Sequence, residues 1–241
     1  MSAPVERLRE LRAQVAWGCR ILQRHGHGDV ALGHISARHP GLDAMLMKGK
    51  GVGLDEVTAA NVVLIDFEGR RLEGSHPIHA ELPLHSEVYR ARPDVGAVVH
   101  THPPYATALG ATGLPLRPVT PHGTLFADGL PVFDETAAVI TNPREGARVA
   151  AALGSHNAVI LKNHGILAVG PTVPWAVYTA AMLERAAELQ ALAHGFGTPE
   201  PIPDAMARTM QGRQHGERQA GEYWEYMKRA LRRAGLAEGL D

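Results

Sequence analysis

The chain has 241 residues, of which 45% are hydrophobic and 20% charged, a composition typical of a soluble globular protein and not of a disordered one. Its 24 basic and 25 acidic side chains leave a formal net charge of −1, and the absence of a long basic run argues against nucleic-acid binding. Apolar stretches fall short of the roughly 20 residues of a membrane span, and the N-terminal segment lacks the apolar core of a signal peptide, so a cytoplasmic protein without membrane association is expected.

Apolar periodicity, prolines and glycines predict the elements of the first half of the chain. In order they are a helix from Pro4 to about Leu22, short strands at 29–38 and 44–48, a hairpin with strands at 61–67 and 70–72, a helix at 83–91, a strand at 96–102 and a helix at 105–109. Pro93 ends the second helix, and Pro103 and Pro104 stop the strand that follows it.

The second half of the chain is read in the same way. It predicts short strands at 116–119 and 138–141, a helix at 142–153, a tight hairpin with strands at 158–162 and 166–169, an alanine-rich helix at 172–193, a linker at 199–203 and a polar helical tail at 204–234. We therefore expect one domain over residues 1–200 and a C-terminal helical tail over residues 201–241.

Hairpins join several of these strands, and hairpin connections make antiparallel pairs. The expected fold is therefore an α/β fold with one mixed or mainly antiparallel sheet and helices on its faces. The dense glycine cluster at 49–53 has neither Walker spacing nor a following Lys-Ser/Thr, so it is a weak candidate for a nucleotide loop.

The sequence His100-Thr-His102 ends a predicted strand. Residues two apart in a strand point to the same side, so both imidazoles project from one face at the strand terminus, where they could bind a metal. A third histidine, His164, lies in the tight Asn-His-Gly turn, and three histidines with an open position are typical of a catalytic metal site. Spacing alone does not bring His164 to the pair, and surface histidines remain the alternative.

Glu81 lies at the start of the helix predicted from Pro83. A carboxylate there could be an ordinary partner of the helix N-terminus, worth about 0.3–1 kcal/mol. It could equally be a general acid/base or a metal ligand, and only its distance from the histidines decides between these roles.

Several segments resemble the class II aldolase/adducin family. They are Glu81-Leu-Pro-Leu-His85, Tyr89-Arg-Ala-Arg-Pro-Asp94-Val, Val-Val-His100-Thr-His102-Pro-Pro-Tyr105 and Leu161-Lys-Asn-His164-Gly165, together with Gly33-His34-Ile-Ser36-Ala-Arg38, which is similar to the family's Gly-Asn-x-Ser-x-Arg loop. The resemblance covers about residues 7–195. It implies a three-layer α/β/α fold with a central, mainly antiparallel sheet, and a homotetramer with sites at subunit interfaces.

The resemblance also implies a site. By it, His100, His102 and His164 bind a divalent metal, zinc in the first instance with manganese, iron or cobalt as alternatives, and Glu81 is the catalytic acid/base that can also ligate the metal. Such a cation polarises substrate oxygens and stabilises the charge that develops when a carbon–carbon bond breaks.

Departures from the family pattern bear on the substrate. Sugar-phosphate members carry a Ser-Ser pair before the catalytic glutamate, where this chain has His79 and Ala80. The family's first-loop asparagine is His34, and its phosphate loop is replaced by a segment with Lys48 and Lys50. Loss of a hydroxyl at a phosphate site forfeits a hydrogen bond worth about 1.5–3 kcal/mol, which argues against a sugar phosphate.

We therefore expect His34, Ser36, His79 and Lys48 or Lys50 to bind a small non-phosphorylated substrate, although solvated lysines in a turn are an equal alternative. The expected function is a metal-dependent lyase, a decarboxylase of a hydroxy-aromatic or a keto- or hydroxy-carboxylic acid. The alternatives are an aldolase or epimerase acting on a sugar phosphate, an Fe(II)-dependent oxygenase and a non-catalytic adducin-like module.

Overall fold

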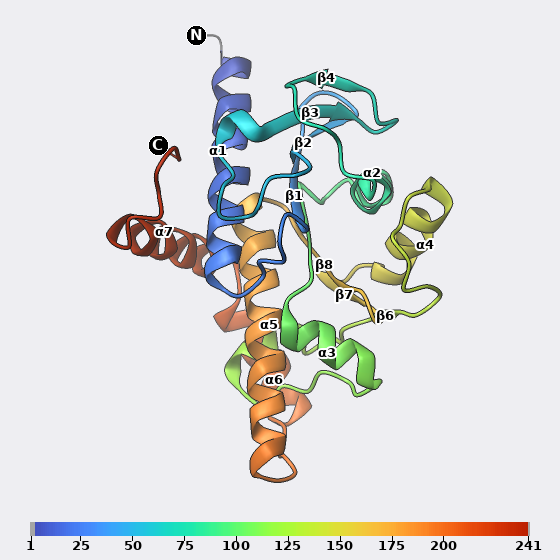
Figure 1. Cartoon of the computed structure of the whole chain (residues 1–241). Helices are drawn as coiled ribbons and strands as arrows, with labels where there is room; N and C mark the ends of the chain where they lie inside the picture. The colour runs from blue at the N-terminus through green and yellow to red at the C-terminus, as the bar shows by residue number, and fades with distance from the viewer. Residues whose placement is uncertain (1–2, 241) are drawn as a thin grey trace.

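A mainly antiparallel sheet divides the protein into helical layers on its two faces (Figure 1). The structure is a computed structural model that describes residues 3–240. Within these residues the strands are β1 (His34–Arg38), β2 (Ala44–Lys48), β3 (Val62–Asp66), β4 (Arg71–Glu73), β5 (Ala97–Thr101), β6 (Val132–Phe133), β7 (Ala158–Leu161) and β8 (Gly165–Gly170). Their order in the sheet is β4-β3-β2-β1-β5-β8-β7-β6, and of these pairs β6–β7 is parallel and the others are antiparallel.

Helices cover both faces of this sheet. One face carries α1 (Ala3–Arg24), α3 (Pro104–Thr112) and α5 (Val173–Phe196), with α6 (Asp204–Gln214), α7 (Glu217–Arg233) and the short 3-10 helices η1 (Ala59–Asn61) and η2 (Pro121–Phe126) at its margin. The other face carries α2 (Leu82–Ala91) and α4 (Pro143–Leu153). The expected three-layer α/β/α architecture with a mainly antiparallel sheet is confirmed.

Strand β5 shows how alternation creates two cores. Ala97 and Val99 pack into the core on the side of α1 and α5, whereas Val98 packs into the core on the side of α2 and α4. A residue's position in a strand therefore decides which helical layer it meets. None of the helices that the structure describes has the length and apolar character needed to cross a membrane.

The C-terminal tail packs on the α1–α5 layer. Trp224 and Met227 of α7 are buried in the same core as α1 and α5. The tail is divided into α6 and α7 at His215, whose ring is held by the hydroxyls of Tyr178 and Thr124. The boundary at residue 200 remains a prediction.

Two predicted strands are absent from the described chain. Around 116–119 the backbone is held by other partners: Arg117 N–H donates to the side chain of Gln190, and Pro118 O accepts from Ile202 N–H. In the predicted strand at 138–141, Ile140 N–H donates to Glu81 instead of to a neighbouring strand. Both predictions were wrong because local apolar pattern does not show where a backbone N–H finds its acceptor.

Helix α4 begins immediately after the loop that carries Ile140. Its N-cap, Asn142, accepts a hydrogen bond from Glu145 N–H at 3.0 Å. We expect Asn142→Ala to lower the free energy of unfolding by about 0.5–2 kcal/mol, measured by urea titration, because that N–H loses its acceptor. Asn142→Asp keeps an acceptor and should stay close to the unmodified protein; an equal loss in both variants would contradict the capping role.

Candidate metal centre

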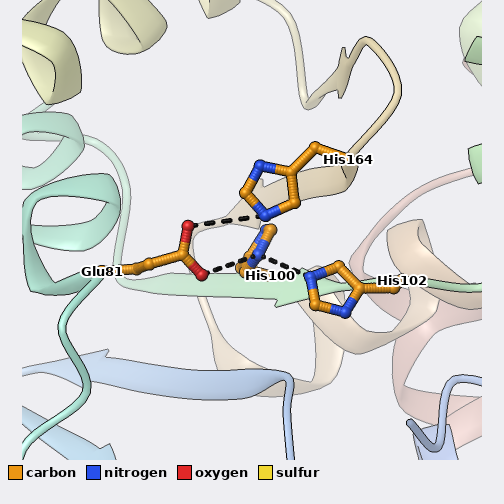
Figure 2. A group of neighbouring side chains, drawn as sticks. All are labelled: Glu81, His100, His102 and His164. Carbon is orange, nitrogen blue, oxygen red and sulfur yellow. Dashed lines mark hydrogen bonds and ion pairs between the residues drawn. The ribbon is translucent and has the colours of Figure 1, made fainter. Parts of the chain in front are cut away.

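Strand pairing brings the candidate residues to one end of the sheet. In the β1–β5 register His34 lies directly opposite His100, while His102 follows the end of β5. The β7–β8 hairpin carries His164 in its turn, where Asn163 adopts a left-handed φ of 58°. Glu81 reaches the same place from the start of α2, so four side chains from three separate segments converge (Figure 2).

The converging atoms are close enough to share one ion. One ligand atom from each of Glu81, His100, His102 and His164 lies within 4.8 Å of the others. Glu81 Oε2 is 3.3 Å from His100 Nε2, and Glu81 Oε1 is 3.5 Å from His164 Nε2. The two Nε2 atoms of His100 and His102 are 3.1 Å apart.

The hydrogen bonds on the far side of the rings identify which nitrogens face inward. His100 Nδ1 lies 2.9 Å from the carbonyl oxygen of Ile166, and His102 Nδ1 lies 2.9 Å from Asp29 Oδ2. Both oxygens are acceptors, so each Nδ1 carries the proton and donates it. In the neutral rings both Nε2 atoms are then bare.

Bare nitrogens 3.1 Å apart, next to a carboxylate oxygen, present only lone pairs to one another. Such an arrangement requires a positive charge among these atoms. A divalent cation supplies it, and metal-bound histidines ordinarily donate their second N–H to a carboxylate or a backbone carbonyl, as His102 and His100 do. The residues present therefore fit a divalent metal.

Burial keeps His102 and His164 in the neutral, metal-binding form. It lowers the pKa of His164 to about 4, with a further contribution from His100. Burial also lowers the pKa of His102, although the Asp29 carboxylate raises it in part. Neutral imidazole is the form that binds metals, so both rings are ready to bind at neutral pH.

Glu81 is ionised and does not cap its helix. Its side chain makes no capping hydrogen bond; Oε1 instead accepts one from Ile140 N–H at 3.2 Å. Burial alone would favour the neutral carboxyl, but its pKa is held well below the usual range, in part by His34. Proximity to the histidines therefore excludes the simple capping role.

Close approach of the β7–β8 turn to β5 requires glycine at position 165. A Cβ on Gly165 would lie 2.6 Å from His102 Cδ2 and from Thr101 O. Because real Cβ atoms do not come this close to a backbone oxygen, a larger residue would push the turn away and separate His164 from His102.

Two of the predicted substrate-binding residues lie at this cluster. His34 Nε2 is 3.6 Å from Glu81 Oε2, and the ring of His79 is 4.4 Å from that of His34 between centroids. His79 Nε2 has no hydrogen-bond partner among residues 3–240. Contact of either ring with substrate stays a prediction.

The other two predictions need correction. Lys48 shares a strand face with Leu46, which packs toward α1, and its Nζ donates to the carbonyl oxygens of Ala31 and Gly33 at 3.0 and 2.9 Å. It is fully buried on the side of the sheet opposite His34, so it supports the loop after α1 and does not face the cluster. Lys50 is exposed in the next turn.

Ser36 lies on the same face as His34 but is fully buried. Its hydroxyl contacts His85 Nδ1 and Tyr89 OH, each at 2.7 Å. The Ser36 hydroxyl therefore bonds His85 and Tyr89 and, contrary to expectation, does not face the substrate.

Sequence reasoning missed the roles of Asp29, His85 and Tyr89. No sequence signal marks Asp29, because it meets His102 only through the fold. His85 and Tyr89 do have one: they follow Glu81 at intervals of four residues, which places all three on one face of α2.

Asp29 orients a candidate ligand, so its removal should weaken metal binding. We expect Asp29→Ala to lower zinc affinity about 10–100-fold, with a smaller loss in Asp29→Asn, measured by competition with a chromogenic chelator. Asp204→Ala, an exposed carboxylate at the start of α6, is the matched control. Equal affinities in the Asp29 and Asp204 variants would contradict the orienting role.

Buried histidines also predict the pH dependence of stability. Burial lowers the pKa of His27 to about 3 and that of His85 well below 6.5. Below about pH 6.5 the unfolded chain binds protons that the folded protein does not, so the free energy of unfolding should fall as the pH drops.

Each such histidine lowers the free energy of unfolding by up to about 1.4 kcal/mol for every pH unit below about 6.5. Urea unfolding of the metal-free protein at pH 7.5, 6.5 and 5.5 measures the slope, and His27→Gln should reduce it. A free energy of unfolding that does not change between pH 7.5 and 5.5 would show the prediction to be wrong.

Comparisons with known proteins agree with this geometry. The family model described as "Class II Aldolase and Adducin N-terminal domain" matches residues 13–191. The chain is 34% identical over 209 residues to 3,4-dihydroxyphthalate decarboxylase of Arthrobacter keyseri, covering 80% of this chain and 83% of that protein. It is also 34% identical over 187 residues to 4-hydroxy-3-prenylphenylpyruvate oxygenase/4-hydroxy-3-prenylbenzoate synthase of Streptomyces roseochromogenus subsp. oscitans, covering 77% and 66%.

Among solved structures, L-fuculose 1-phosphate aldolase from Glaciozyma antarctica PI12 superimposes with a TM-score of 0.85 at 25% identity, covering 96% of this chain and 93% of that one. The solved structure confirms the expected fold. The decarboxylase relative and the family model confirm the expected reaction class, a carbon–carbon lyase. The match of the family model to most of the chain, together with the converging histidines and glutamate, shows that this protein belongs to the class II aldolase and adducin family.

Proposed function

We propose that this protein is a divalent-metal-dependent decarboxylase of a hydroxylated aromatic acid. The observation that carries the proposal is the convergence of Glu81 with His100, His102 and His164 within 4.8 Å. Three nitrogen ligands with room for substrate are typical of catalytic zinc sites, so His100, His102 and His164 are the proposed ligands and zinc the proposed metal.

Glu81 is the proposed acid/base. It is ionised in the substrate-free protein, so it can take a proton from a substrate hydroxyl and later return it to the ring carbon from which CO₂ departs. The bond between the ring carbon and the carboxylate breaks, and its electron pair stays on that carbon until Glu81 protonates it. A bound divalent cation would supply Lewis-acid stabilisation of the negative charge that develops.

The surroundings of the cluster favour an aromatic acid over a sugar phosphate. Ala80 offers no hydroxyl where sugar-phosphate members of the family carry serine, and Lys48 lies on the opposite face of the sheet. His34 and His79 instead bring two imidazole rings to the neighbourhood of Glu81 in place of groups suited to phosphate. The similarity to 3,4-dihydroxyphthalate decarboxylase supports the same substrate class.

An Fe(II)-dependent oxygenase is the second candidate. The named oxygenase among the relatives supports it, and His100, His102 and Glu81 provide two histidines and a carboxylate, the ligand set of many non-haem iron oxygenases. Consumption of O₂ during turnover separates this reaction from simple decarboxylation.

We further propose a cytoplasmic homotetramer. The one cysteine, Cys19, is free and buried, which fits a reducing compartment. Membership of the class II aldolase and adducin family supports the oligomer.

The decisive experiment measures CO₂ release from 3,4-dihydroxyphthalate and related dihydroxybenzoates by the purified protein. We expect release that is lost after chelation and restored by zinc or manganese. Glu81→Gln should lower kcat about 10²–10⁴-fold, because a carboxamide cannot carry the proton.

Glu68→Gln, an exposed carboxylate on the β3–β4 hairpin, is the matched control and should keep full activity. Cleavage of L-fuculose 1-phosphate without CO₂ release from any aromatic acid would overturn the proposal in favour of an aldolase. Stoichiometric O₂ uptake would overturn it in favour of an oxygenase.

A further inference from the structure

A buried row of polar side chains extends from Glu81 into the protein, between β1 and α2. His34 Nδ1 lies 2.7 Å from His85 Nε2, His85 Nδ1 lies 2.7 Å from Ser36 Oγ, and Ser36 Oγ lies 2.7 Å from Tyr89 OH. The exposed fractions of these four residues are between 0 and 2%. At its other end, His34 Nε2 faces Glu81 Oε2 at 3.6 Å.

The two supporting elements explain why these five residues form a row. Glu81, His85 and Tyr89 are spaced by four residues and share one face of α2. His34 and Ser36 are two residues apart in β1 and share the face of the sheet that α2 covers. The helix face therefore lies along the strand face, and side chains from the two elements alternate along the row.

The ionised carboxylate at one end determines the direction of every hydrogen bond. A carboxylate only accepts, so an attractive contact requires a proton on His34 Nε2. In a neutral ring His34 Nδ1 is then bare and must accept from His85 Nε2–H. His85 Nδ1 is bare in turn and accepts from the Ser36 hydroxyl, whose oxygen accepts from Tyr89 O–H.

The opposite direction has a specific cost. It would place a bare nitrogen of His34 against the ionised oxygen of Glu81, two lone pairs facing each other in a buried site. With both rings neutral, one proton per contact satisfies the whole row. Tyr89 is 1% exposed, so the row ends inside the protein and cannot carry protons to solvent.

We propose that Tyr89, Ser36 and His85 are positioning residues that lock His34 in its Nε2–H tautomer, so that His34 holds Glu81 in a fixed orientation for proton transfer. His34 stands where the family resemblance expects asparagine, so the row depends on a residue that departs from that family pattern. This inference rests on the proposed role of Glu81 as acid/base, but the tautomers themselves can be measured without any substrate.

The first test is nitrogen NMR of the full-length protein carrying ¹⁵N-labelled histidine, in the zinc-loaded form and again after chelation. Signals are assigned with His34→Asn and His85→Gln. We expect His34 and His85 each to show a protonated Nε2 and a bare Nδ1. Protonated Nδ1 in either ring would overturn the proposal.

The second test removes the donor that orients His85. In Ser36→Ala, His85 Nδ1 has no hydroxyl to accept from, so we expect His34 and His85 to populate both tautomers. Decarboxylase kcat should fall roughly 10–100-fold, with KM and zinc affinity changed less than about threefold. Tyr89→Phe removes only the outer hydroxyl and should produce a smaller change in the same direction, which keeps the test valid if Ser36→Ala folds poorly.

Tyr178→Phe is the matched control, because Tyr178 also bonds a histidine, His215, but on the opposite side of the sheet. It should leave both tautomers and kcat unchanged. Single tautomers and an unaltered kcat in Ser36→Ala and Tyr89→Phe would overturn the positioning role. If the tautomers respond as expected but no aromatic acid is decarboxylated, the row stands and the proposed reaction fails.

Discussion

Lone pairs of His100, His102 and the Glu81 carboxylate face one another at the end of β5, with His164 beside them, and the surrounding structure holds these groups in place. The arrangement is unfavourable without a cation, so His100, His102 and Glu81 each need rigid support from behind. His100 is anchored by the carbonyl of Ile166, His102 by Asp29, and Glu81 by the amide of Ile140. Each anchor lies on an element other than the one that carries the group it holds, so the site is as rigid as the packing of the sheet against its loops.

This constraint explains features that would otherwise be weaknesses of the fold. A fully buried lysine, Lys48, is tolerated because its ammonium group ties down the carbonyl oxygens of the loop that carries Asp29. The loop before α4 does not pair with a strand; its Ile140 N–H donates to Glu81 instead. A buried charge and a loop amide thereby help to position the clustered side chains.

The same cluster can serve several reactions within the family, because a cation beside a carboxylate stabilises negative charge wherever a carbon–carbon bond breaks. Discrimination between substrates must then come from the side chains around it. In this chain the residues we propose for that role are His34 and His79, which replace the asparagine and serine that the family resemblance leads one to expect. The ring at position 79 removes a hydroxyl contact suited to phosphate, and the ring at position 34 adds a hydrogen bond to His85.

The local pattern of the sequence was sufficient to predict most helices and strands, because apolar periodicity and proline positions act over a few residues. It also predicted that His100 and His102 share one side, because strand alternation is a local property. The helical spacing of Glu81, His85 and Tyr89 was equally readable, although nothing local showed what that face would meet.

Tertiary structure alone decided the rest. The β1–β5 register placed His34 opposite His100, and the β7–β8 hairpin brought His164 across more than 60 residues of chain to the same point. The β1–β2 pairing places Lys48 on the opposite face of the sheet from His34. The packing of the loops brings Asp29 to His102 and the amide of Ile140 to Glu81. These outcomes depend on which distant segments pair, and pairing is set by the summed burial of the two cores, which no single motif encodes.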